Sequence, residues 1–99
     1  MTRRLRVAPR ASGQIEEASA WRFSHRPMAP RGFAEDLEQA FELIRSTPGV
    51  GQPVEHPRYP AVRRVLLGRS RYHLYYRESD DVIEVVALWH ASRGGDPHL

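Results

Sequence analysis

The residues best suited to chemistry are basic or aromatic and fall between Val62 and Arg93. They are Arg63 or Arg64, Arg69, Arg71, His73, Tyr75, His90 and Arg93. Cleavage of RNA without a metal needs a base near the 2′-hydroxyl, a cation at the developing phosphorane and an acid for the leaving oxygen. His73 and Tyr75 share one strand face because they are two residues apart, and His90 can approach them from a neighbouring strand. A second interpretation stays open: the histidines fill partly buried strand positions, and the arginines provide solubility or contact a partner.

Other chemistries find no support in the sequence. The five histidines show no metal-ligand spacing, and the chain has no cysteine to act as a thiolate ligand or nucleophile. The segment Gly49–Gly51 follows a helix rather than opening one, which is the wrong context for a phosphate-binding loop. No serine lies at a strand-to-helix elbow. The sequence therefore predicts neither a metal site nor a cofactor.

The distribution of charge indicates the kind of partner. All fifteen basic residues are arginine, and the net charge is +3. The stretch from His56 to Arg77 holds six arginines and no acid, whereas Glu35–Glu42 holds four of the twelve acids. Arginine binds phosphate and carboxylate groups through a planar fork. We therefore expect one electropositive end that favours a nucleic acid or an acidic partner protein.

Three short strands are expected to position these residues. Val62–Leu67, Tyr72–Glu78 and Val82–His90 are rich in β-branched or aromatic side chains and are separated by short turns. Such spacings allow only antiparallel neighbours, so we predict a three-strand meander. Strict alternation in the last strand puts Ile83, Val85, Ala87 and Trp89 on one face and Val82, Glu84, Val86, Leu88 and His90 on the other. Both sets are mostly apolar, which predicts a central strand covered on both sides.

The N-terminal half predicts one strand and two helices. Arg3–Ala8 alternates apolar with basic residues, as an edge strand does. We expect a first helix from an N-cap at Ser12 to about His25, with an apolar face of Ile15, Ala18 and Trp21. A second helix from about Gly32 to Ser46 has a clear stripe of Phe33, Leu37, Ala40, Phe41 and Ile44. The segment Val50–Pro60, rich in proline and glycine, is expected to be a surface loop.

The length allows one domain over residues 1–99, with a loose tail over 94–99. The predicted class is α+β: a short N-terminal strand, an antiparallel helical hairpin and then the meander. Neither a signal peptide nor a stretch of about 18 apolar residues is present, so we expect a cytoplasmic protein without membrane contact.

The stretch Val62–Arg93 resembles the C-terminal half of the RelE/ParE superfamily of bacterial toxins, especially the ParE branch. The matching segments are the basic strand VRRVLLG, the aromatic strand RYHLYYR and the closing strand VIEVVALWHASRG. The likeness extends weakly over the whole chain, since the family order is one strand, a helical hairpin and this meander.

The resemblance implies a toxin of a type II toxin–antitoxin pair that arrests growth. RelE-like members cleave messenger RNA in the ribosomal A site with several basic residues and, in many cases, a C-terminal tyrosine. ParE-like members lack that set and poison DNA gyrase without known catalytic residues of their own. Here His73 occupies the place of an arginine in the RelE pattern, and no tyrosine follows Arg93. These departures favour the gyrase-binding branch.

The partners and site residues that we expect follow from this interpretation. A cognate antitoxin, ParD-like or similar, would wrap the hairpin and sheet, and operator DNA would be bound only through the complex. We expect target contacts at Arg64, Arg69, Arg71, His90 and Arg93, and antitoxin contacts at Trp21, Phe41, Tyr75 and Arg77. The alternative is a ribosome-dependent endoribonuclease that uses Arg63, Arg64, His73, His90 and Arg93. A second alternative is a degenerate member that binds its antitoxin but is not toxic.

Overall fold

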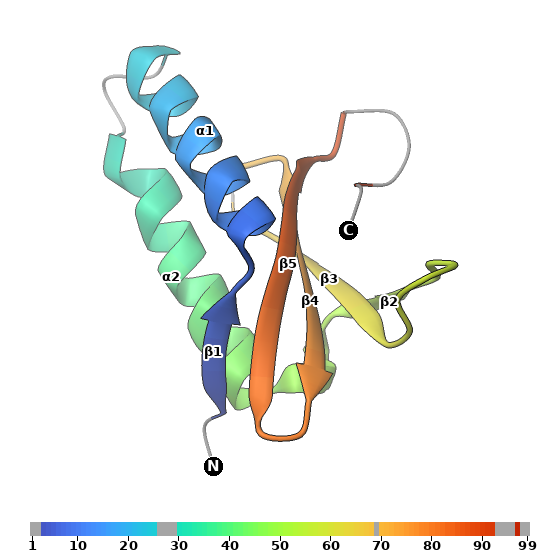
Figure 1. The fold of residues 1–99 in the computed structure, drawn as a ribbon. Coiled ribbons are helices and arrows are strands. Elements are labelled where there is room, and N and C mark those ends of the chain that lie inside the picture. The colour runs from blue at the N-terminus through green and yellow to red at the C-terminus, as the bar shows by residue number, and fades with distance from the viewer. Residues whose placement is uncertain (1–2, 26–29, 69, 93–96, 98–99) are drawn as a thin grey trace.

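Two helices lie side by side against one face of a five-stranded sheet (Figure 1). The computed structural model describes residues 3–25, 30–68, 70–92 and 97. The elements in chain order are β1 (Arg4–Val7), α1 (Pro9–His25), α2 (Pro30–Ser46), the 3-10 turn η1 (Pro48–Val50), β2 (Gln52–Val54), β3 (Val62–Leu66), β4 (Tyr72–Ser79) and β5 (Val82–His90). The predicted α+β class and element order are confirmed, and the three meander strands end within one residue of their predicted bounds.

The strand order is β1-β5-β4-β3-β2. The strands β3, β4 and β5 pair antiparallel, as the short turns predicted, and β1 lies at an edge, where it pairs parallel with β5. The prediction of a plain loop over Val50–Pro60 is wrong, because Gln52–Val54 pairs antiparallel with β3. This strand is short and holds Pro53, which an edge strand tolerates because one side of it needs no ladder hydrogen bond.

The first helix begins earlier than predicted. Pro9 is its first residue, and the amide of Ser12 donates to the carbonyl oxygen of Ala8 at 2.9 Å, which is the first intrahelical bond. Ser12 is therefore not the N-cap. Proline suits the first helical position because its fixed φ is helical. An N–H at that position would have no intrahelical acceptor, so its absence costs no hydrogen bond. As a result Ala11 enters the core, fully buried.

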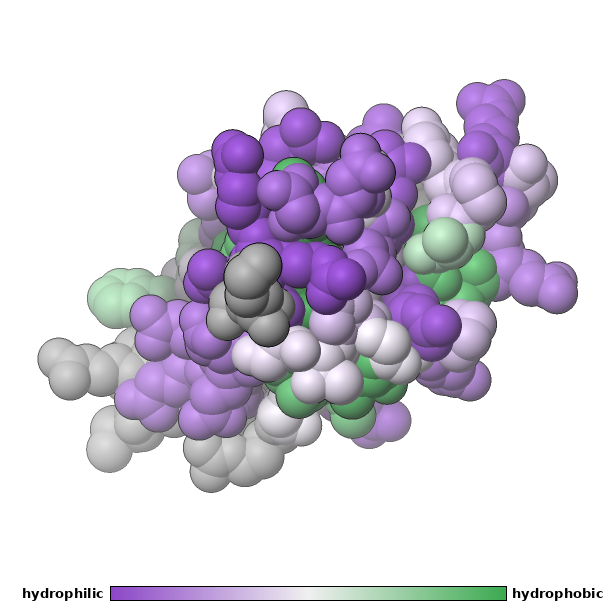
Figure 2. Space-filling model, turned by 90° about the horizontal axis from the view of Figure 1, so that it is seen from below, coloured by the Kyte–Doolittle hydropathy of each residue, from purple (hydrophilic) through white to green (hydrophobic). Residues whose placement is uncertain are grey.

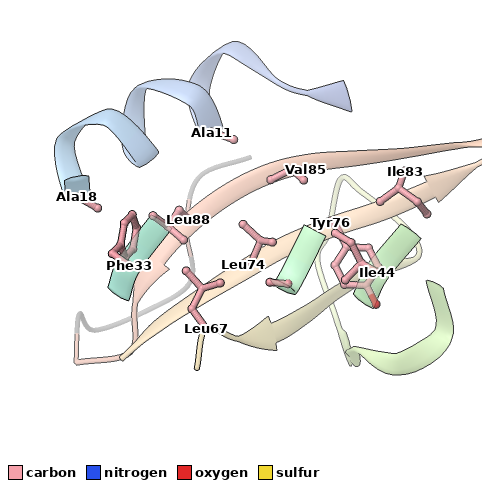
Figure 3. Close-up of a cluster of buried hydrophobic side chains, with 11 residues drawn as sticks. Ala11, Ala18, Phe33, Ile44, Leu67, Leu74, Tyr76, Ile83, Val85 and Leu88 are labelled. Atoms are coloured by element: carbon pink, nitrogen blue, oxygen red, sulfur yellow. The ribbon is translucent and has the colours of Figure 1, made fainter. Parts of the chain in front are cut away.

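The core between helices and sheet is built mainly from side chains of α2, β4 and β5 (Figure 3). The predicted stripe of α2 is confirmed: Phe33, Ala40 and Ile44 are buried, while Leu37 and Phe41 pack against the core partly exposed. Tyr76 lies in this core, and its hydroxyl donates to the carbonyl oxygen of Pro48 at 2.7 Å and accepts from the amide of Gly51 at 2.9 Å. The tyrosine thus ties η1 to the centre of the sheet.

A β-bulge in β5 interrupts the alternation of its side chains. Beyond the bulge each side chain points to the face opposite to the one that strict alternation predicts. Tyr75 is opposite Ala87 while Tyr76 is opposite Val85, so Val86 is the extra residue. Strict alternation therefore holds through Val86 and is wrong from Ala87 onward. The sheet face turned away from the helices has its own buried cluster, composed of Val62, Tyr75, Val86 and Ala87 with Val54, Tyr59 and Trp89 packed against it. We call this side the open face.

The end of the molecule where β4 joins β5 is mainly hydrophilic, with hydrophobic residues only in small separate areas (Figure 2). That end does not resemble an apolar docking surface. Within the described ranges, neither helix is long and apolar enough to cross a membrane. The predicted loose tail over 94–99 lies almost entirely outside the described residues.

Candidate functional site

The open face carries a basic and aromatic group on β2, β3 and β4. Arg64 is opposite Tyr75 and donates from Nη1 to its hydroxyl oxygen at 3.4 Å, while Nε donates to Oε1 of Gln52, also at 3.4 Å. His73 lies on the same face, with its ring centroid 6.4 Å from that of Tyr75. Leu66 is opposite His73 and is 56% exposed. This part of the face therefore joins a guanidinium, an imidazole and an exposed apolar side chain.

The pKa of His73 lies below its ordinary value. Burial is the larger cause, because it disfavours the charged imidazolium, and the nearby Arg64 guanidinium lowers the pKa further. His73 is consequently a neutral ring at physiological pH. A neutral ring can accept a proton or a hydrogen bond, but it does not add to the positive charge of the surface.

His90 does not join this group, contrary to the expectation that it would approach His73. The bulge at Val86 turns the last residues of β5 over, so His90 faces the helix side with Tyr72, to which its ring is T-shaped at 4.9 Å between centroids. Its Nδ1 accepts from the amide of Ser92 at 3.1 Å, which leaves the proton of the neutral ring on Nε2. The two histidines therefore lie on opposite faces of the sheet.

Arg63 is also turned away from the open face. It is opposite Tyr76, and its Nη1 donates to the carbonyl oxygens of Gly51 at 2.8 Å and Gly49 at 3.4 Å. These bonds hold the loop after α2 against β3. Arg63 thus has a structural role, and of the four described residues predicted for a ribonuclease only Arg64 and His73 come together. Arg93 lies outside the described residues.

The remaining arginines of the acid-free stretch divide in two. Arg77 is opposite Glu84 and is bound to it, with Arg77 Nε and Nη2 both 2.9 Å from Glu84 Oε1. Arg58 and Arg71 are exposed, and Arg69 lies outside the described residues. Among the described arginines of this stretch, Arg58, Arg64 and Arg71 therefore contribute to the surface charge, whereas Arg63 and Arg77 are bound within the fold.

The predicted antitoxin contacts are scattered over the molecule. Trp21 is 49% exposed on α1, and Phe41 packs partly exposed against the main core. Tyr75 is only 2% exposed and offers almost no surface, because Val62 and Ala87 pack around it. Arg77 has its guanidinium carbon 5.3 Å from the ring centroid of Tyr59. These four residues do not form one patch.

A groove that sequence reasoning missed lies between α1 and the end of β5. It has a volume of about 270 Å³ and is lined by Gln14, Glu17, Ala18, Trp21, Tyr72, Leu88 and His90. The helical spacing of Gln14, Ala18 and Trp21 is the signal that could have placed Gln14 on the same face of α1 as the other two. The sequence could not show that β5 is the strand facing α1. This placement depends on the parallel pairing of β1, which directly precedes α1, with β5. Glu84 was also missed, although it is the only acid within the apolar strand β5 and such an acid calls for a cationic partner.

Within the described ranges no group of three or more His, Asp or Glu side chains could hold a metal ion. Two surfaces of the described residues stand out as candidate sites: the open face with Arg64 and His73, and the groove beside α1. The two surfaces lie on different sides of the sheet.

Comparisons with known proteins agree with this fold. The family model described as the ParE toxin of the type II toxin–antitoxin system parDE matches residues 5–94. No curated protein matches the chain significantly in sequence. Among solved structures, the chromosomal ParDE system from P. aeruginosa contains a chain that is 16% identical, with a TM-score of 0.76 over 92% of this chain and 98% of that one.

Two other solved structures share the fold with lower TM-scores. The E. coli toxin RelE, solved as a mutant in the free state, is 18% identical with a TM-score of 0.65, over 93% of this chain and 86% of that one. The E. coli DinJ-YafQ toxin-antitoxin complex contains a chain that is 14% identical with a TM-score of 0.66, over 96% of this chain and all of that one (100%). The family match spans nearly the whole chain, and the chain therefore belongs to the ParE toxin family of type II toxin–antitoxin systems.

Proposed function

We propose that the chain arrests growth by binding DNA gyrase in the cytoplasm, and that a cognate ParD-like antitoxin neutralises it. Family membership supports a toxin held by an antitoxin. The solved relative from P. aeruginosa is described as a ParDE system, which favours an antitoxin of the ParD kind. Binding of operator DNA is then a property of the complex, because the antitoxin brings the DNA-binding domain.

The observation that carries the proposal is the placement of the candidate catalytic residues. General acid–base cleavage needs its acid and base within hydrogen-bond reach of one reacting phosphate. His73 and His90 lie on opposite faces, and Arg63 is bound to the loop after α2. A protein that acts by binding alone needs no such convergence. The arrangement of the described residues therefore favours a binder over a ribonuclease.

Arg64 on the open face, together with the exposed Arg58 and Arg71, supplies the proposed contact with gyrase. Arg58, Arg64 and Arg71 give this region positive charge, and Leu66 adds exposed apolar surface. Mixed cationic and apolar surfaces of this kind bind acidic protein surfaces, with arginine frequently among the residues that dominate affinity.

A supercoiling assay tests the proposal directly. The purified chain should inhibit supercoiling of relaxed plasmid by gyrase, and one equivalent of antitoxin should restore it. Arg64→Ala should weaken the inhibition about tenfold or more. The matched control is Arg4→Ala, an exposed arginine of β1 at the other edge of the sheet, which should retain full inhibition. Unimpaired supercoiling at micromolar toxin would refute gyrase as the target.

A ribosome-dependent endoribonuclease is the second candidate, and one observation favours it. A neutral His73 beside Arg64 on an open sheet face is suited to accept the 2′-hydroxyl proton of RNA. Codon-specific cleavage of ribosome-bound message, abolished by His73→Ala, would establish this activity. Unimpaired growth on induced expression without antitoxin would favour the degenerate, non-toxic alternative instead.

A further inference from the structure

One end of the open face is covered by the chain itself. Val62, Arg64 and Leu66 of β3 are two residues apart and point to the same face of the sheet. Leu66 is 56% exposed, whereas Val62 at the other end of this row is 1% exposed. Tyr59 packs against the buried cluster that contains Val62. We call residues 55–61, the loop that joins β2 to β3 and carries Tyr59, the strap (Figure 1).

Tyr59 is held by a cation that belongs to the sheet. The guanidinium carbon of Arg77 lies 5.3 Å from the centroid of the Tyr59 ring, within the range of a cation–π contact. Arg77 is fixed separately to Glu84, with two nitrogens each 2.9 Å from Oε1. Tyr59 can therefore leave the guanidinium without breaking the ion pair.

The strap is stiff within itself. The ring centroid of His56 lies 5.3 Å from that of Tyr59, and His56 Nδ1 accepts from the amide of Arg58 at 3.1 Å. Pro57 and Pro60 fix the φ angles of two further residues. All of these features lie within the strap and move with it, so a change in its position is concentrated at its ends.

Ala61, at the end of the strap that joins β3, has a strained backbone. Its φ is +62°, in the left-handed region that residues with a Cβ adopt only at a cost. A return to negative φ removes this cost and redirects the chain just before Val62, which takes Tyr59 off the sheet. Ala61 is therefore suited to act as a hinge whose strain favours opening.

The Tyr59 side chain is not packed on all sides, because it lines two hollows. One has a volume of about 630 Å³ and is lined by strap residues that include His56 and Ala61. The other has a volume of about 230 Å³ and is lined by Arg77 and by Pro9 at the start of α1. A ring beside open space makes fewer attractive contacts than a core side chain does, so less energy opposes its departure.

We propose that the strap is an autoinhibitory cover with two states. The closed state is the one described above, with Tyr59 against Arg77. In the open state Ala61 returns to negative φ, Tyr59 leaves the sheet, and Val62 is exposed beside Arg64. The target binds the open state and so shifts the population towards it. The effect on gyrase rests on the proposed function, whereas the opening is a property of the free chain.

Labelling of a single buried thiol measures the opening. The chain has no cysteine, so Val62→Cys places its one thiol under the strap. Val85→Cys is the matched control, because Val85 is an equally buried valine in the core beneath the helices. In excess iodoacetamide, Val62→Cys should react at least about tenfold faster than its global unfolding permits, as measured by urea denaturation. Val85→Cys should react no faster than its own global unfolding. The same limit for Val62→Cys would overturn the inference.

Two glycine substitutions in the Val62→Cys chain locate the hinge. Ala61→Gly removes the cost of the left-handed angle, so it stabilises the closed state and should slow labelling about threefold. Asp80→Gly is the matched control, since Asp80 has a φ of +51° but lies in the turn between β4 and β5. Its labelling should stay within about twofold. Equal slowing in both variants would mean that global unfolding exposes Val62, against the inference.

Supercoiling assays connect the strap with the target, in chains that keep Val62. Tyr59→Ala removes the contact with Arg77, so it should inhibit gyrase at a concentration at least about threefold lower than the wild type does. Ala61→Gly should require about threefold more protein, and Asp80→Gly should match the wild type. Weaker inhibition by Tyr59→Ala would make Tyr59 a contact of the target and would overturn the autoinhibitory role.

The outcomes distinguish this inference from the proposed function. If the wild type inhibits gyrase and Ala61→Gly inhibits it equally well, the autoinhibitory role is wrong while the proposed function stands. If the wild type does not inhibit supercoiling, the proposed function fails and the autoinhibitory role fails with it. Fast labelling of Val62→Cys would in that case still establish that the strap opens.

Discussion

Arg77 and Glu84 face each other across β4 and β5, and two guanidinium nitrogens of Arg77 each lie 2.9 Å from Oε1 of Glu84. The other oxygen of the same carboxylate, Oε2, accepts from Nη2 of Arg6 at 3.0 Å. The Glu84 side chain is 13% exposed, so most of its water has been replaced by the two arginines. One carboxylate therefore joins β1, β5 and β4 on the open face.

Glu84→Gln should lower the free energy of unfolding by about 1–3 kcal/mol, because it leaves the partly buried Arg77 without its counter-charge. Urea denaturation measures this change. The matched control is Glu42→Gln, which removes a 3.1 Å pair with Arg45 whose carboxylate is 66% exposed. The control should cost less than about 0.5 kcal/mol. Equal losses in the two variants would show that the Glu84 pair contributes no more than a surface pair.

Tyr76→Phe should lower the free energy of unfolding by about 1–3 kcal/mol, because the buried amide of Gly51 loses its acceptor. Tyr75→Phe is the control, since the contact that its hydroxyl makes among the described residues is a long one of 3.4 Å from Arg64. Its loss should be smaller. An unchanged urea midpoint in Tyr76→Phe would mean that η1 is held in place by other contacts.

Stability should fall at alkaline pH through Tyr76. Burial raises its pKa above the ordinary value, and the amide of Gly51 and the charge of Arg63 only partly offset this effect. The phenol is then neutral in the folded protein at a pH where the unfolded chain ionises. Stability is therefore complete below about pH 10 and is lost as the pH rises through the folded pKa. Urea midpoints between pH 8 and 11 should fall more steeply in the wild type than in Tyr76→Phe.

Stability should also fall at mildly acidic pH through His73. Its pKa is lowered in the folded protein, first by burial and then by the Arg64 charge. Below the unfolded pKa of about 6.5, His73 is protonated in the unfolded chain but stays neutral in the folded protein. The free energy of unfolding therefore falls as the pH falls. Arg64→Gln should raise the His73 pKa, measured by NMR titration of the ring, without removing the effect of burial. Arg71→Gln should leave it unchanged, and equal shifts in both variants would contradict a specific role for Arg64.

Two glycines should respond oppositely to alanine. Gly13 lies within α1 with nothing within 4 Å of an added Cβ, so Gly13→Ala should stabilise the protein by about 0.5–1 kcal/mol. Gly68 has a φ of +37°, and an added Cβ would overlap the carboxylate of Asp36. Gly68→Ala should destabilise the protein by about 1–3 kcal/mol. Thermal unfolding measures both, and a stabilised Gly68→Ala would show that the turn can relax.

Features with a strong local pattern could be predicted from the sequence. The stripe of α2 repeats every three to four residues, and the turns between β3, β4 and β5 are too short for parallel strands. Both signals depend only on neighbouring residues, and both are confirmed. The family resemblance predicted that β1 and the helical hairpin precede the meander. The match of the ParE family model to residues 5–94 agrees with this resemblance.

Features that depend on distant residues or on competing local signals could not be predicted in this way. Pro9 looked like the end of a strand, although proline also begins helices. Val85 and Val86 are both valine, so the pattern of polar and apolar residues does not show that Val86 is the extra residue of a bulge. That bulge separates His90 from His73, and the candidate ribonuclease site predicted from strand parity is divided as a result. The place of β1 beside β5 follows from a parallel pairing across 78 residues, which no local pattern reveals.

The position of β5 between β1 and β4 has a consequence for biosynthesis. The strand β1 is translated before β5, and it cannot pair with its neighbour until Val82–Val85 have been translated. Nascent chains that stop short of this segment cannot close the sheet, and pairing between segments so distant in sequence is intrinsically slow. The closed sheet, and the surfaces that depend on it, can therefore form only after residues 82–85 have been synthesised.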